Sequence, residues 1–108
     1  MTNVADYREH IGTRPEKFHK ATLFQGDHLM VGINCLEPGQ AQSVHDHADQ
    51  DKVYIVMEGS GHFTVGDATH DAGPGAVVWA AAGVPHGVEN RGDRRLVILV
   101  NMAPPPGK

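Results

Sequence analysis

Apolar residues along this chain fall into short runs that are separated by glycine-containing turns. Val, Ile and Leu dominate these runs, and no stretch shows the sustained period of an amphipathic helix. The pattern predicts an all-β fold, in the form of a small closed or sandwiched barrel. Turns that leave runs of about one strand between them are expected at Gly26-Asp27, Pro38-Gly39, Gly59-Ser60, Gly66-Asp67, Pro74-Gly75 and Gly92-Asp93.

The length of the chain agrees with one small domain. It has 108 residues, and 13 glycines and seven prolines punctuate the apolar runs. We expect residues 1–20 to form a partly irregular N-terminal extension and residues 21–108 to form a single barrel domain. A chain of this size buries only about 60% of its unfolded surface, and the segment 21–25 would be free to pair with the edge of a neighbouring copy. A homodimer is therefore expected.

Charge and hydropathy limit the classes of partner and the cellular location expected for this protein. The formal net charge is −4, and the basic residues are scattered except for Arg91, Arg94 and Arg95. Nucleic acid is not an expected partner, because its binding needs clustered cations. The N-terminus lacks the apolar region of a secretion signal, and no apolar run has membrane-spanning length. These features predict a cytoplasmic protein with no membrane partner.

Two gapped motifs carry the chemistry. The first runs from Gly39 to Gly59 and contains His45 and His47, and the second contains His86. Residues i and i+2 of a strand point to the same face, about 7 Å apart, so His45 and His47 are expected to close on one metal ion. His86 would supply a third ligand from another strand. Convergent neutral imidazoles form a good site for a divalent ion and a poor core.

These segments resemble the two signature motifs of the cupin family, G-x5-H-x-H-x3,4-E-x6-G and G-x5-P-x-G-x2-H-x3-N. Two positions depart from the pattern: Lys52 stands where the first motif has its acidic ligand, and Ala81 stands where the second has proline. The resemblance covers roughly residues 28–102. It implies a small, jelly-roll-like cupin β-barrel that binds one divalent transition metal ion, namely Fe, Mn, Zn or Ni.

The sequence does not identify the fourth metal ligand, because the ammonium group of Lys52 cannot coordinate a metal unless it is deprotonated. Asp51 or Gln50 would reach the metal through a local register shift. Alternatively, the three histidines and water hold the ion, or Lys52 turns outward. Three histidines with water is the preferred arrangement.

Strand parity predicts the lining of the barrel. Ser43 shares the face of the histidines, and Lys52 shares a lining face with Tyr54, Val56 and Glu58. Tyr54 is the preferred group for proton transfer, although a packed aromatic is its ordinary role. Glu58 is expected at the solvent rim. The apolar part of the cavity is expected to involve Met30, Val56 and Val88. Trp79 is expected to pack in the core, and the alternative is that it walls the cavity.

The resemblance implies a metal-binding protein that acts on a small organic ligand. A site of three neutral imidazoles leaves the ion its full charge and an open position. The expected activity is that of a metal-dependent dioxygenase, isomerase or lyase. The alternative is a cupin that binds or senses a small molecule without catalysis.

Overall fold

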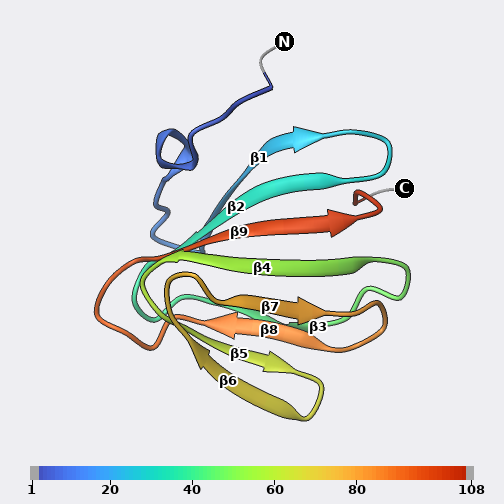
Figure 1. Cartoon of the computed structure of the whole chain (residues 1–108). Helices are drawn as coiled ribbons and strands as arrows, with labels where there is room; N and C mark the ends of the chain where they lie inside the picture. Colours follow the sequence, from blue (N-terminus) through green and yellow to red (C-terminus); the bar gives the residue numbers. More distant parts are fainter. Residues whose placement is uncertain (1–2, 107–108) are drawn as a thin grey trace.

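The computed structural model describes residues 3–106 as nine β-strands and one short 3-10 helix (Figure 1). Every expected turn lies between two strands, which confirms the strand pattern read from the sequence. None of the helices in residues 3–106 is long and apolar enough to cross a membrane. The elements are η1 Tyr7–His10, β1 His19–Gln25, β2 Met30–Leu36, β3 Ala41–His45, β4 Asp51–Glu58, β5 Gly61–Val65, β6 Ala68–Ala72, β7 Val77–Ala80, β8 His86–Glu89 and β9 Leu96–Ala103.

The strands form two antiparallel sheets, as an all-β, jelly-roll-like barrel requires. One sheet has the order β1-β2-β9-β4-β7 and the other has the order β3-β8-β5-β6. In Figure 1 the strands β5, β6 and β8 of the smaller sheet are seen in the lower part of the view, and β1, β2, β9 and β4 of the larger sheet in the upper part. The main hydrophobic core draws residues from both sheets, including Leu36, Tyr54, Phe63, Val88 and Ile98. The predicted fold class is confirmed.

Glycines of the two motifs lie where the chain needs a left-handed backbone. Gly39, Gly59, Gly75 and Gly83 all have positive φ, between 78° and 90°. Such angles are costly for residues with a Cβ atom. At Gly59 a Cβ atom would also collide with the backbone carbonyl of Arg95. The closing glycine of the first motif therefore lets β4 turn tightly beside the chain that enters β9.

Asn90, the last residue of the second motif, fixes the start of the β8–β9 connection. Its side chain is fully buried and donates to the carbonyl oxygens of Leu36 and Arg94, each at 2.8 Å. Its Oδ1 accepts from the backbone N–H of Gly92 at 3.0 Å. A buried amide with these partners holds three backbone segments together. Asn90 thus serves the fold and does not face the site.

Trp79 corrects one expectation from the sequence. It was expected to pack in the core, but 56% of its surface is exposed. In β7 the burial alternates, so that Val78 and Ala80 point inward while Val77 and Trp79 point outward. The aromatic ring therefore lies outside the barrel and cannot line its cavity.

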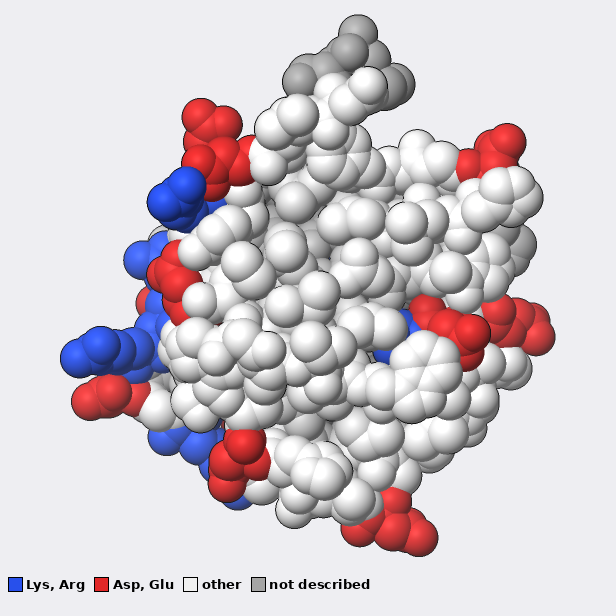
Figure 2. All heavy atoms as spheres, in the orientation of Figure 1, with Lys and Arg blue, Asp and Glu red and all other residues white. Residues whose placement is uncertain are grey.

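The outer face of the larger sheet is poor in charge. In Figure 2, drawn in the orientation of Figure 1, charged residues gather mainly toward the margin and uncharged atoms cover the centre over β2, β9 and β4. The N-terminal segment covers part of this sheet, because Tyr7 and Ile11 pack against a second cluster of Ile33, Cys35 and Val97. Beyond that cover, Val77 is 64% exposed beside Trp79.

The motif glycine gives the first testable prediction. Replacing Gly59 with alanine should lower the free energy of unfolding by about 2 kcal/mol or more, because positive φ and the contact with Arg95 both oppose a Cβ atom. Urea denaturation measures the change. Gly73→Ala is the matched control, because a Cβ atom there meets nothing within 4 Å. Equal stability of the two variants would contradict this account of the turn.

The homodimer stays a prediction, for which the structure offers two surfaces. One is the outer sheet face around Val77 and Trp79, and the other is the free edge of β1. Light scattering at micromolar concentration should give about twice the chain mass of 11.6 kDa. Trp79→Lys should produce a monomer if the sheet face is used, whereas the exposed control Thr69→Lys on β6 should not. A monomeric wild-type protein would refute the dimer.

Candidate metal centre

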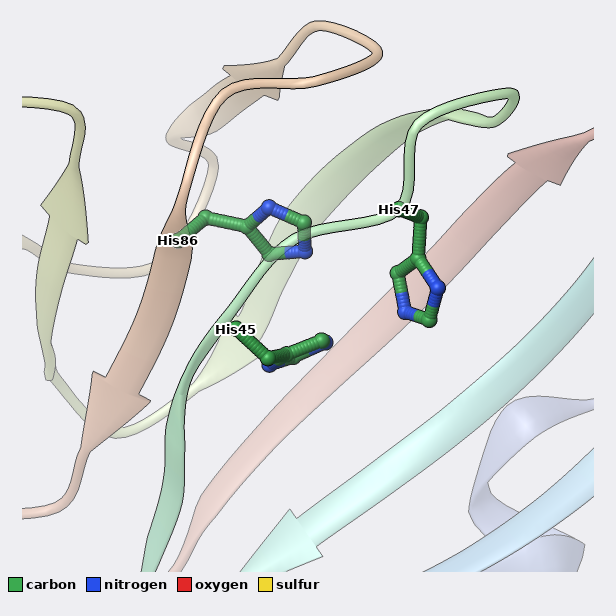
Figure 3. Close-up of side chains that lie close together, drawn as sticks. All are labelled: His45, His47 and His86. Atoms are coloured by element: carbon green, nitrogen blue, oxygen red, sulfur yellow. The ribbon is translucent and has the colours of Figure 1, made fainter.

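Three imidazoles converge between the ends of β3 and β8 (Figure 3). His45 ends β3 and His86 begins β8, and the antiparallel register pairs the two residues directly. His47 lies two residues beyond the end of β3, so the prediction that it belongs to the strand is wrong. The loop nevertheless turns its ring toward the others. One ring nitrogen from each residue lies within 4.8 Å of the other two.

Backbone carbonyls orient two of the rings. The Nδ1 atom of His86 lies 2.9 Å from the carbonyl oxygen of Val84, and the Nδ1 atom of His45 lies 2.7 Å from that of Ser43. A carbonyl oxygen only accepts, so each neutral ring carries its proton on Nδ1 and keeps a lone pair on Nε2. Metal-binding histidines in proteins are commonly oriented in this way.

The Nε2 atom of His86 has no hydrogen-bond partner among residues 3–106, although it is buried. Only 1% of the His86 surface is exposed. A buried acceptor without a partner costs about 1–3 kcal/mol, and a metal ion would remove that cost. The residues present therefore fit a divalent cation.

Burial also favours the ligating form of two of the rings, those of His86 and His47. It lowers the pKa of His86, and Lys52 lowers the same pKa further. The pKa of His47 is lowered first by burial and then by His45 and Lys52. Neutral imidazole is the form that binds metals. The lowered pKa values of His47 and His86 thus favour the form of these rings that binds a cation at neutral pH.

Lys52 lies inside the barrel, so the alternative that it turns outward is wrong. It is only 4% exposed, and its regular pairing with Met102 and Ala80 places it on the inner face of β4. Its amine lies 5.0 Å from the centre of the Tyr54 ring. Burial, and then Lys20, lowers the pKa of the amine to about 8. The described residues give this amine no carboxylate partner.

Neither predicted fourth ligand joins the three-histidine group. The carboxylate of Asp51 accepts from the backbone N–H of Ala82 at 2.9 Å, and the amide of Gln50 donates to the carbonyl of Pro104 at 3.2 Å. The register shift of β4 against β9 lies between Val56 and Glu58, far from Asp51 along the strand. No carboxylate belongs to the group formed by the described histidines.

A cavity of about 520 Å³ opens beside the group. Of the expected apolar lining, only Met30 contributes, because Val56 and Val88 are buried in the core. His45, His47 and Lys52 all line it. The remaining lining residues are Lys20, Ala21, Thr22, Gln25, Gly32, Asn34, Gln42, Val100, Met102 and Pro106.

Gln42 replaces Ser43 on the lining face, which corrects the parity expected for β3. The pairing of β3 with β8 shifts between Gln42 and His45, so the alternation of side chains is broken there. Ser43 is exposed, whereas Gln42 lines the cavity. Sequence reasoning missed Gln42 because nothing in the residue pattern marks a bulge at this point.

Tyr54 is buried beneath Gln42. Its hydroxyl donates to Oε1 of Gln42 at 2.7 Å, and its ring packs on Phe63 with 5.3 Å between ring centres. Burial raises the pKa of the phenol. Tyr54 does not line the cavity, and its contacts are those of a packed aromatic that positions Gln42. Glu58 is exposed, as expected, and accepts from the Tyr7 hydroxyl, but it does not line the cavity with Lys52.

Known proteins resemble this chain over nearly its whole length. Residues 32–102 match the family described as Cupin domain. An uncharacterized protein of Streptomyces coelicolor is 38% identical over 77 residues, which make up 71% of each chain. The crystal structure of TT1209 from Thermus thermophilus is 37% identical with a TM-score of 0.93, covering 97% of this chain and 100% of that one. An RmlC-like cupin protein from Desulfovibrio desulfuricans is 28% identical with a TM-score of 0.85, covering 97% and 99%.

The geometry predicts that metal binding requires all three histidines of the group. Replacing His86 with alanine should remove most of the bound metal and lower the melting temperature of the metal-loaded protein, because a ligand and its binding free energy are lost. His45→Ala and His47→Ala should act alike. Elemental analysis of the purified variants measures the metal.

His70→Ala is the control for this experiment, because His70 is exposed on β6 and lies outside the group. It should change neither metal content nor stability. Full metal occupancy in His86→Ala would refute the site.

Proposed function

The chain belongs to the cupin family, as its two motifs predicted, and we propose that it is a metal-dependent enzyme acting on a small organic molecule. The observation that carries this proposal is the buried Nε2 atom of His86, which has no partner among the described residues and belongs to a group with His45 and His47. A pure packing role would leave this atom unsatisfied. A role as ligand explains its orientation.

His45, His47 and His86 would hold one divalent transition metal ion, with Fe, Mn, Zn and Ni as the candidates. Such an ion supplies Lewis-acid polarisation of a bound oxygen, or activation of water or dioxygen. The protein contributes three imidazoles, and burial lowers the pKa of two of them, His47 and His86, which favours their neutral form. It also contributes backbone carbonyls that fix two of the rings.

The ligand would bind in the cavity next to His45 and His47. One part of the wall is apolar, with Met30, Val100 and Met102, and another is polar, with Asn34 and Gln42. Pockets that combine an apolar body with a few placed polar groups suit small organic ligands. Buried Tyr54 supports this wall through its hydrogen bond to Gln42.

The reaction class proposed is that of a dioxygenase, an isomerase or a lyase. One observation favours the alternative, a cupin that binds or senses a small molecule without turnover. No Asp, Glu, Tyr or Cys of the described chain lines the cavity. An enzyme of this kind would have to move protons through Lys52, Lys20 or the ligand itself.

Turnover in the presence and absence of metal tests the proposal. The purified protein is stripped with a chelator, reloaded separately with Fe, Mn, Zn or Ni, and incubated with a panel of small organic acids, aldehydes and sugars. An enzyme should form product with one particular metal and lose activity with chelator. A binder should show a ligand-dependent rise in melting temperature and no product. Absence of metal binding under all conditions would refute the metal-dependent enzyme and leave only the small-molecule binder.

A further inference from the structure

We infer that the cavity selects small carboxylate anions and that Lys52 is the residue that recognises them. The inference deepens the proposed function and rests on it in one respect, because the second donor atom of the ligand would face the three-histidine group. It concerns the ligand class, which neither the family nor the histidines fix.

The lining of the cavity carries positive charge. Lys20 and Lys52 both line the cavity, from β1 and β4, and no carboxylate side chain of the described residues lines it. Metal binding by neutral imidazoles would add positive charge at His45 and His47, which line the same cavity. The cavity therefore carries an excess of positive charge that the protein itself does not balance. An anionic ligand would balance it.

Lys52 is buried at the cavity, with only 4% of the residue exposed. A charged amine in such a place is costly unless a counter-charge or hydrogen-bond acceptors surround it. Its contact in the described structure is the face of Tyr54, at 5.0 Å from the ring centre, which is a cation–π contact. That contact leaves the N–H donors of the amine without acceptors among the described side chains. A ligand carboxylate in the cavity would accept from them.

The cavity combines Lys52 and two of the histidines with apolar side chains. Lys52, His45 and His47 line one cavity, and Met30, Val100 and Met102 line it as well. A carboxylate held by Lys52 would thus have room for a neighbouring oxygen near the imidazoles and for an apolar body along the wall. The ligand class that fits is a 2-hydroxy or 2-oxo carboxylate with an apolar substituent.

A matched pair of probes tests this inference. Mandelate and mandelamide have nearly the same shape, but only mandelate is an anion. Calorimetric titration of the metal-loaded and the metal-free protein should give at least about tenfold tighter binding of mandelate, because charge-assisted hydrogen bonds exceed neutral ones by about this factor. Lys52→Met should bring the ratio of the two affinities close to one while elemental analysis shows the metal retained.

Two further variants control the result. Lys17→Met removes an exposed lysine that does not line the cavity and should leave the ratio unchanged. Lys20→Met should reduce the ratio less than Lys52→Met, because Lys20 is exposed to solvent. Thermal unfolding of each variant establishes that it is folded. Should Lys52→Met not fold, Lys52→Gln takes its place.

The possible outcomes separate this inference from the proposed function. Equal binding of mandelate and mandelamide to a metal-loaded wild-type protein would overturn the inference and leave the metal site standing. An unchanged preference for mandelate in Lys52→Met would also overturn it. A preference that depends on Lys52 in a protein that binds no metal would support the inference and refute the proposed metal-dependent function.

Discussion

The pairing of β3 with β8 sets His45 opposite His86, and the candidate metal centre depends on that register. Each of these residues stands at a strand end, where a neighbouring backbone carbonyl is available to its Nδ1 atom. The carbonyl selects the tautomer, and the tautomer leaves Nε2 for a ligand. A shift of one residue in this pairing would turn one imidazole to the other face of the sheet and dismantle the group.

Other residues of the two motifs position strand ends and carry no chemistry themselves. Gly59 lets the chain leave β4 closely beside the backbone of Arg95, and Asn90 ties the end of β8 to Leu36 at the end of β2. These residues lie in the same motifs as the histidines because strand ends and ligands must be positioned together. A motif that mixes glycines, an asparagine and histidines therefore encodes turns and ligands in one pattern.

The turns, the strands and the histidine group could be predicted from the sequence because each has a local cause, such as glycine at positive φ or an apolar run in a strand. The lining of the cavity was predicted less well. Ser43 was expected to face inward, and the irregular pairing of β3 placed Gln42 there instead. A bulge depends on how two strands meet, which the pattern of one strand does not contain. The prediction that Trp79 is buried was wrong for a related reason. The alternation of side chains within β7 can be read from the sequence, but which of its two faces is covered by the rest of the protein cannot.

Lys52 shows how one departure from a family pattern changes the electrostatics of a site. A carboxylate at this position would offset the charge of a bound cation and satisfy its coordination from within the protein. A lysine adds charge instead, and its burial on the inner face of β4 keeps that charge at the cavity. The pairing of β4 with β9 is regular at Lys52, so no bulge turns its side chain away from the cavity. We infer that the negative charge which a family acid would bring comes instead from the ligand, which would make the ligand part of the site's charge balance.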